Sequence, residues 1–147
     1  PEDQVACLVC IRRHLKPGGR LVVHLDHQDF AWLGGLLGEK GGVFEPANPF
    51  RHPETGLLVR TAHAWSLEPS TQTAIVQTAW EEFDENGRAT RQWKTAPIRL
   101  HCLFRFEMEH LLARTGFKVE ALFGDFFRQP LVDKSDSMIF VAVSNEL

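Results

Sequence analysis

The residues best suited to chemistry follow a short apolar run near the start of the chain. Leu21–Leu25 is almost entirely Leu and Val, and Asp26 and His27 come directly after it. Such a run predicts a strand, and ligands of open α/β sheets bind at the carboxyl ends of strands. A carboxylate or imidazole placed there can take a proton from a hydroxyl or amine, or orient it. Asp26 and His27 are therefore our candidate catalytic residues. The alternative is a helix-capping Asp beside a satisfied loop His, and we expect His24, inside the strand, to be packed.

A second group of residues lies in the middle of the chain, where large aromatic side chains recur with arginines. The group consists of Arg60, His63, Trp65, Trp80, Arg91, Trp93 and Arg99. Aromatic rings with a few guanidinium groups can hold a small planar or anionic molecule. From this group we select Arg60, Trp65 and Trp93 as candidate substrate-binding residues. Arg105 and Asp125, each next to a predicted element, are added for the same role. The alternative is a sheet with one packed face and one wet face.

Three cysteines are present, an odd number that does not suit a disulfide framework. Cys7 and Cys10 have C-x-x-C spacing, but a structural zinc site needs four ligands. Only the distant His101 and Cys102 remain to complete one. The pair falls in a predicted helix, where free cysteine packs as a small hydrophobe. We predict no metal site, and a zinc-bound chain using the three cysteines is a weaker alternative.

The bulk composition is that of an ordinary globular domain and excludes several classes of partner. The chain has 147 residues, of which 44% are hydrophobic and 24% charged, so that a sizeable core is expected. The net charge of -3 gives no electrostatic reason to bind nucleic acid. The sequence has no apolar run long enough to predict a membrane span. Unpaired cysteines make the reducing cytoplasm the default location.

The candidate residues must be positioned by a mixed set of helices and strands. A helix is predicted over 2–16, Pro17-Gly18-Gly19 ends it, and a strand follows over 20–26. The nearly continuous apolar character of that strand favours a buried parallel strand. The stretch 27–56 is predicted to be irregular, with one short helix near 30–37.

The remainder of the chain is predicted to be strand-rich at first and mixed at the end. Antiparallel strands are expected over 58–68, 73–83 and 89–100, with a hairpin turn at Glu85-Asn86-Gly87 and an edge position at Pro97. A helix over 105–115 that ends at Gly116 follows. Two final strands are expected over 119–123 and 138–143, and the fully apolar second one is predicted to be central.

Two motifs give this order of elements a family resemblance. The first is Leu15-Lys16-Pro17-Gly18-Gly19-Arg20-Leu21-Val22-Val23, a helix that turns into a strand. The second motif runs from Phe104 to Val119 and consists of the helix over 105–115 and its step Gly116-Phe117-Lys118-Val119 into the next strand. With the turn Gly124-Asp125-Phe126 and the apolar terminal strand, they resemble the C-terminal half of a class I S-adenosylmethionine-dependent methyltransferase.

The resemblance implies an α/β fold: the C-terminal half of a seven-stranded Rossmann-like sheet with an inserted antiparallel β-sheet lid. Residues 1–28 would supply a helix and a core strand of that sheet. Residues 29–103 would form a loop and an antiparallel insert that covers the methyl acceptor. Residues 104–147 would supply a helix and the terminal β-hairpin.

The resemblance implies S-adenosyl-L-methionine as the cofactor, with its site largely outside this chain. The family's glycine-rich turn after the first strand and the acidic end of its second strand are absent from the sequence. The glycines between 34 and 42 do not follow a predicted strand at the required distance. The implied activity is methyl transfer to an oxygen, nitrogen or carbon of a small-molecule acceptor. We expect this chain to be a fragment of such an enzyme that is inactive alone.

The resemblance also predicts an open sheet edge along Leu21–Leu25, because the neighbouring strand of the family is missing. An apolar open edge promotes association. We expect it to pair with the missing N-terminal half or with a second copy of the chain. The alternative to an enzyme is a non-enzymatic ligand-binding or dimerisation module that uses the Trp-rich antiparallel sheet.

Overall fold

A computed structural model describes residues 2–38 and 41–145 of the chain. Residues 1, 39, 40, 146 and 147 belong to the predicted segments 1–28, 29–103 and 104–147 but lie outside the described residues. The chain forms two compact units. The sheet unit consists of Pro1–Gln28 and Leu103–Leu147, and the insert unit consists of Asp29–Cys102.

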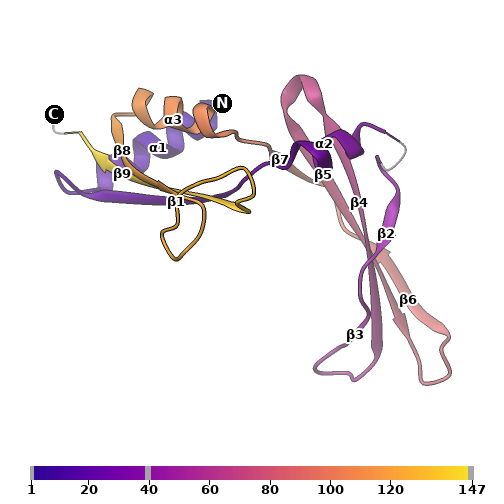
Figure 1. The fold of residues 1–147 in the computed structure, drawn as a ribbon. Coiled ribbons are helices and arrows are strands. Elements are labelled where there is room, and N and C mark those ends of the chain that lie inside the picture. Colours follow the sequence, from indigo (N-terminus) through magenta and orange to yellow (C-terminus); the bar gives the residue numbers. More distant parts are fainter. Residues whose placement is uncertain (1, 39–40, 146–147) are drawn as a thin grey trace. The chain divides into compact units, whose positions relative to one another are not determined.

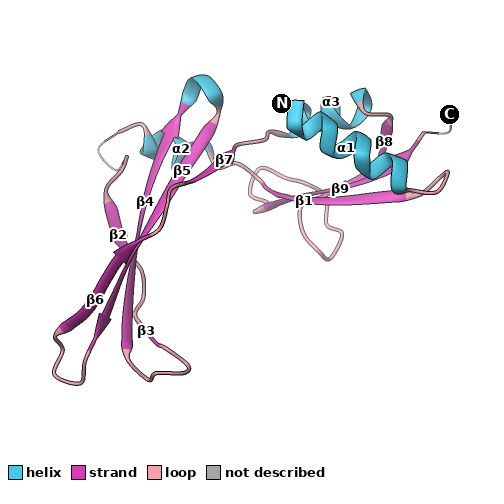
Figure 2. Ribbon diagram, turned by 180° about the vertical axis from the view of Figure 1, so that it is seen from behind, coloured by secondary structure: helices cyan, strands magenta, loops and turns pink. Residues whose placement is uncertain are grey.

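The sheet unit is a three-stranded sheet with two helices on one face. Its elements are α1 (Glu2–His14), β1 (Arg20–Asp26), α3 (Arg105–Arg114), β8 (Phe117–Phe123) and β9 (Ser137–Ser144). The strand order is β1–β9–β8, and both pairings are antiparallel. Figure 1 shows α1 and α3 over the same face of this sheet, and Figure 2 shows the same arrangement from behind.

The core of the sheet unit lies between its helices and its strands. It is a cluster of buried apolar side chains: Leu8, Met108, Leu112, Phe117, Met138, Phe140 and Ala142. Leu112 and Phe140 are both 0% exposed, and full burial of such a side chain contributes about 1.5–3 kcal/mol. Packing therefore holds α1 and α3 on the sheet. The prediction that the apolar last strand is central is confirmed, since β9 lies between β1 and β8.

Two glycines in the left-handed region set the ends of the helices in this unit. Gly18 has φ +69°, and the N–H of the following Gly19 donates to the Lys16 carbonyl at 2.8 Å. Gly116 has φ +84° and turns the chain from α3 into β8. Both turns are confirmed predictions, because glycine adopts this backbone conformation at little cost. The predicted helix over 2–16 is two residues too long, since α1 ends at His14.

The prediction of a buried parallel strand over 20–26 is wrong. β1 pairs antiparallel with β9, and exposed and half-buried residues alternate along it. Leu21, Val23 and Leu25 pack against the core, whereas Val22 is 61% exposed. The reason is that α1 and α3 cover one face of the sheet only, so that every second residue of β1 lacks a cover within this unit. Among the described residues β1 is an edge strand, as the sequence predicted for Leu21–Leu25.

The insert unit is a six-stranded antiparallel sheet with one short helix. Its elements are α2 (Phe30–Leu36), β2 (Phe44–Pro46), β3 (Phe50–Arg51), β4 (Leu58–Glu68), η1 (Pro69–Thr71), β5 (Thr73–Phe83), β6 (Ala89–Lys94) and β7 (Ile98–His101). The order is β2–β4–β5–β6, with β3 on β4 and β7 on β5. The predicted strands over 58–68 and 73–83 are confirmed with the same bounds. The predicted hairpin turn is also confirmed, because Gly87 has φ +75° between β5 and β6.

Two predictions for the insert unit need correction. The strand expected over 89–100 is two strands, β6 and β7, which pair with different parts of the long β5. Pro97 lies between them, because proline has no N–H to donate to a ladder. The stretch 27–56 contains α2, as predicted, but also β2 and β3. These strands are only three and two residues long, too short for a periodic signal.

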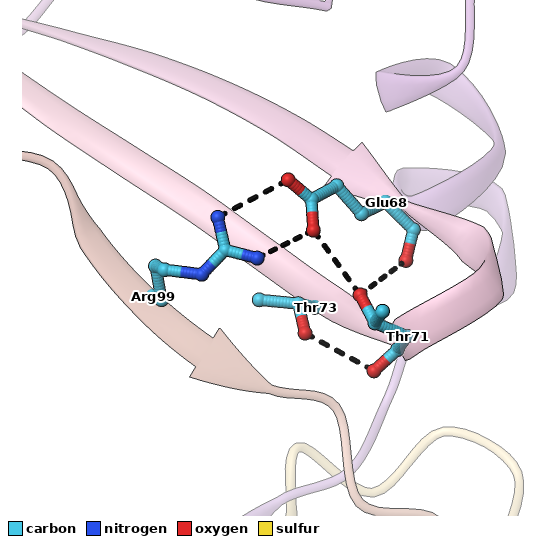
Figure 3. A network of polar contacts seen from close by, with 4 residues as sticks. All are labelled: Glu68, Thr71, Thr73 and Arg99. Carbon is cyan, nitrogen blue, oxygen red and sulfur yellow. Dashed lines mark hydrogen bonds and ion pairs between the residues drawn. The ribbon is translucent and has the colours of Figure 1, made fainter.

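A network of polar side chains joins β7 to the turn between β4 and β5 (Figure 3). Both terminal nitrogens of Arg99 donate to the carboxylate of Glu68. Thr71 Oγ1 donates to the same carboxylate at 3.2 Å, and Thr73 Oγ1 donates to the Thr71 carbonyl at 3.0 Å. The hydrogen bonds from Arg99 lower the pKa of Glu68. Arg99 is thus engaged in fastening the sheet.

Candidate functional site

His27 follows β1 directly and is held by the loop between β8 and β9. Its Nδ1 lies 2.8 Å from the Ser135 carbonyl oxygen, and its backbone N–H donates to the Asp136 carbonyl at 3.0 Å. A carbonyl oxygen only accepts, so Nδ1 is the protonated nitrogen and the lone pair of the neutral ring lies on Nε2. Within residues 2–38 and 41–145 no group hydrogen-bonds Nε2. The half-buried ring therefore presents a proton acceptor at the end of a strand.

Asp26 and His24, which precede His27 in the chain, differ from what the sequence predicted. Asp26 is exposed at the end of β1 and does not cap a helix. The N-cap of α2 is Asp29, whose Oδ1 accepts the N–H groups of Ala31 and Trp32 at 2.7 and 3.1 Å. The expectation that His24 is packed is wrong, because it lies on the exposed face of β1. There it contacts Ser137 Oγ at 3.0 Å.

Asp125 organises the loop that holds His27. Its Oδ1 accepts the backbone N–H groups of Phe127 at 2.8 Å and Gln129 at 3.0 Å. The side chain is half-buried and closes the first turn of the loop after β8. Local structure explains the hydrogen bonds of Asp125, because Asp side chains commonly accept a hydrogen bond from the backbone N–H two residues later.

Arg105 is the first residue of α3, and its guanidinium is paired on the helix surface. Nε donates to Glu109 Oε1 at 2.9 Å, one helical turn later, and Cζ lies 5.1 Å from the centre of the Phe106 ring. The side chain is exposed. An exposed pair of this kind contributes at most about 1 kcal/mol, so Arg105 is easily redirected toward a ligand.

Arg60 and Trp93 line one groove of about 580 Å³ on the insert sheet. Ala62 and Ala79 lie opposite each other in the register and also line it, so that small side chains leave room between larger ones. The Arg60 guanidinium lies 4.4 Å from the Phe83 ring. Further lining groups include the cation of Lys94, whose Nζ is 4.5 Å from the Phe44 ring, and the carboxylate of Glu81. Aromatic surface and cations are thus combined in this groove.

Trp93 belongs to an aromatic stack. Its ring is nearly parallel to that of Trp80, with centroids 5.8 Å apart and an interplanar angle of 5°. The Arg91 guanidinium lies 4.8 Å from the centre of the Trp93 ring. The register explains the stack, because Trp80 and Trp93 are directly opposite on β5 and β6. The register of the hairpin therefore places the two rings next to each other.

Trp65 lines a different hollow, of about 180 Å³, between α2 and β4. Its ring meets that of Trp32 edge to face at 5.3 Å and 76°. His63 and Glu45 also line the hollow, and His63 Nδ1 is 3.1 Å from Thr78 Oγ1. Sequence reasoning missed Trp32 and Glu45. They reach Trp65 only through the placement of α2 and β2 along β4, which no local motif indicates.

The cysteines do not adopt the arrangement expected from the helix pattern. Cys7 and Cys10 are exposed rather than packed, and Cys102 is buried in the insert unit. Across the described ranges, no three His, Cys, Asp or Glu side chains converge as metal ligands would. Among the same residues, no helix has the length and apolar character needed to span a bilayer.

Comparisons with known proteins match this chain at the level of solved structures only. No family model and no curated protein matches it. The CcbJ methyltransferase from Streptomyces caelestis matches with a TM-score of 0.70 and 21% identity over 99% of this chain and 51% of its own. An S-adenosylmethionine-dependent methyltransferase from Clostridium acetobutylicum matches with a TM-score of 0.69 and 10% identity. The match covers 99% of this chain and 52% of that methyltransferase. CalS10, an amino pentose methyltransferase from Micromonospora echinaspora, matches with a TM-score of 0.62 and 20% identity. The match covers 96% of this chain and 50% of CalS10.

These matches define the class of fold. Almost the whole chain has the fold of S-adenosylmethionine-dependent methyltransferases. The chain spans about half the length of the methyltransferases it matches. The mixed α/β architecture predicted from the two motifs is thereby confirmed.

The described residues do not fit a site for S-adenosylmethionine. In Rossmann-like folds a glycine-rich turn leads from a parallel strand into a helix. Here β1 has no parallel partner among the described strands, and Gly34 and Gly35 lie inside α2 rather than in such a turn.

Proposed function

We propose that this chain is the acceptor-side, C-terminal portion of an S-adenosylmethionine-dependent methyltransferase that acts on a small molecule. The observation that carries the proposal is the match along 99% of this chain to 51% of a methyltransferase chain. Two matched proteins are described as an amino pentose methyltransferase and a sugar N-methyltransferase. On that basis we extend the proposal to a sugar-like acceptor that is methylated on nitrogen or oxygen.

Within this proposal the two units have different tasks. The sheet unit contributes His27, whose Nε2 takes the proton of the acceptor, and Asp26, which helps to orient it. The insert unit contributes proposed acceptor-binding residues of its own, with Arg60 and Trp93 in the groove and Trp65 in the separate hollow. Arg105 and Asp125 keep their proposed roles near the acceptor, with Asp125 acting through the loop. When bound, S-adenosylmethionine supplies the methyl group as an electrophile.

The open edge of β1 is where we propose that the N-terminal half of the enzyme joins. β1 pairs on one side only among the described strands, and the matched methyltransferases are about twice as long. The unpaired backbone groups of Leu21–Leu25 can extend the sheet with one more strand. A second copy of the chain at this edge is the competing occupant. Protection of the Leu21–Leu25 amides from exchange in a longer monomeric chain supports the proposal, and protection only in a dimer of the short chain contradicts it.

Calorimetry with S-adenosylhomocysteine tests the proposed function. We expect no heat of binding with the 147-residue chain. A longer gene-encoded chain that restores the upstream strands is expected to bind. Absence of binding in both forms contradicts the proposal. It would favour a non-enzymatic ligand-binding or dimerisation module, which the aromatic groove of the insert sheet also suits.

A further inference from the structure

We infer that Ser135 and Gly124 are positioning residues for His27, and that the loop between them fixes the imidazole with its lone pair on Nε2. The inference rests on the proposed function, because it concerns the residue proposed to take the proton of the acceptor. It gives Gly124, which belongs to the turn Gly124-Asp125-Phe126, and Ser135 a role that no comparison assigns. All the groups involved belong to the sheet unit.

His27 is attached to the loop at two points. The side chain donates through Nδ1 to the Ser135 carbonyl at 2.8 Å, and the backbone donates to the neighbouring Asp136 carbonyl at 3.0 Å. The carbonyls of two consecutive residues thus accept hydrogen bonds from the ring and from the backbone N–H of His27. This double attachment restricts rotation of the ring, because turning it breaks the Nδ1 bond while the backbone stays anchored.

Ser135 is itself held by reciprocal hydrogen bonds with Val132. The N–H of Ser135 donates to the Val132 carbonyl at 2.9 Å, and the N–H of Val132 donates to Ser135 Oγ at 3.0 Å. The serine side chain and main chain are both used. The carbonyl that faces His27 therefore belongs to a closed turn rather than to a free segment.

The absence of a side chain at Gly124 leaves room for Ser135. A Cβ built on Gly124 would stand 2.2 Å from Ser135 Oγ and 2.9 Å from Ser135 Cβ, which is closer than atoms can approach. The N–H of Gly124 donates to the Gln129 carbonyl at 2.8 Å, so the glycine is fixed in the same loop. Any side chain at Gly124 must displace Ser135, and with it the carbonyl that orients His27.

The chemical consequence concerns one proton. With Nδ1–H bound to Ser135, Nε2 receives the proton of the acceptor hydroxyl or amine, and the electron pair of the broken bond stays on the acceptor atom. The ring becomes imidazolium, whose Nδ1–H still has its carbonyl partner. The other tautomer has a proton on Nε2 and is unable to accept one there.

The tautomer of His27 is measured directly in the 147-residue chain with 15N-labelled histidine. Long-range proton–nitrogen correlation distinguishes a protonated Nδ1 from a protonated Nε2, and His27→Asn identifies the signal among the seven histidines. We expect the neutral form of the ring to be a single tautomer, protonated at Nδ1. A ring protonated at Nε2, or an even mixture, overturns the inference. The measurement needs neither cofactor nor enzyme activity. It can therefore contradict the inference on His27 without contradicting the proposed function, and the calorimetry can contradict the proposed function without contradicting the inference.

Variants of the loop separate positioning from general stability. Gly124→Ala is expected to replace the single tautomer by a mixture. Gly124→Ala with Ser135→Gly removes both contacts with the serine side chain, but the Pro130 carbonyl stays 3.0 Å from the new Cβ and the Val132 N–H loses its acceptor. A partial return of the Nδ1–H form is therefore expected. Gly34→Ala, in open space within α2, is the matched control and should leave the spectrum unchanged. A Gly124→Ala chain that keeps the wild-type tautomer overturns the role of Gly124.

A pair of His27 variants remains informative if Gly124→Ala does not fold. The side-chain amide introduced by His27→Asn can occupy the place of Nδ1 and donate to Ser135, whereas the longer side chain introduced by His27→Gln places its amide at the Nε2 end. We expect the thermal midpoint to fall less for His27→Asn than for His27→Gln. Equal or reversed losses contradict an anchoring bond from Nδ1 to Ser135.

Discussion

The guanidinium of Arg12 lies over Gly116, so that a Cβ built on Gly116 would stand 2.6 Å from Arg12 Cζ. Arg12 comes from α1, and Gly116 ends α3 with φ +84°. Arg12 Nη2 also donates to the Asn145 carbonyl after β9 at 3.4 Å. One flexible cation thus joins a helix, a helix end and the last strand, and the glycine gives it the space.

Gly116→Ala is predicted to lower the free energy of unfolding by about 1–2 kcal/mol, because alanine is strained at positive φ. Chemical denaturation measures the loss. Arg12→Ala combined with Gly116→Ala should recover only the part of this loss that the steric clash causes, since the backbone strain at residue 116 remains. Gly34→Ala, in a helix with open space, serves as the control and should be neutral or slightly stabilising. Equal stability of Gly116→Ala and the wild type contradicts the prediction.

Phe140→Ala is predicted to destabilise the chain by about 3–5 kcal/mol, because it opens a cavity in the core. Phe140 is 0% exposed on the central strand of its sheet. The measurement is the midpoint of unfolding in urea. Val132→Ala, at a loop residue that is 59% exposed, is the control and should change stability by less than about 0.5 kcal/mol.

The Glu68–Arg99 pair is predicted to make stability depend on pH in the acid range. The pKa of Glu68 is lowered below the ordinary 4.5, mainly by the hydrogen bonds from Arg99. A lowered pKa in the folded state means that the stabilisation is present above 4.5 and is lost as pH falls through the folded value. Glu68→Gln should therefore have a lower thermal midpoint than the wild type at neutral pH. The difference should shrink as the pH falls below the ordinary pKa of glutamate, and added salt should also reduce it. A constant difference across this range contradicts the prediction.

In the proposed full-length methyltransferase, His27→Asn is predicted to lower kcat by about 10²–10⁴-fold, because the proposed base for the acceptor proton is removed. The KM for the acceptor should change little. Steady-state kinetics with the identified acceptor measures both. Restoration of the rate at high pH, where the acceptor loses its proton to solvent, would support the role, and an unchanged kcat would contradict it.

In the proposed full-length methyltransferase, Trp93→Ala is predicted to raise the KM for the acceptor about tenfold, which corresponds to roughly 1.4 kcal/mol of lost binding free energy. Arg60→Ala should act in the same direction through the same groove. Asn86→Asp, at the exposed turn of the β5–β6 hairpin, is the control with unchanged kinetics. A groove that serves only partner binding would leave KM unaffected and change the oligomeric state instead.

Much of the fold follows from local patterns, and the site follows from them only in part. The strands over 58–68 and 73–83 are predictable because alternating apolar and β-branched residues act over a few positions. His27 is a candidate because it follows a strand. Ser135, which orients it, lies 108 residues away and has no motif of its own. The exposure of His24 is missed for the same reason: the sequence does not say which face of β1 the helices cover.

The features that can be read from the amino-acid sequence are those that depend on each residue's own backbone preferences. Pro17 and Gly18 stop the first helix, and Asn86-Gly87 turns the hairpin, because these residues favour or forbid particular φ values. Which strands pair, and in which direction, depends instead on packing between distant segments of the chain. β9 inserts between β1 and β8 and makes β1 antiparallel, because the hairpin that carries β9 buries Met138 and Phe140 under two helices at once. Burial of this kind sums over residues far apart in the chain, and no local pattern records it.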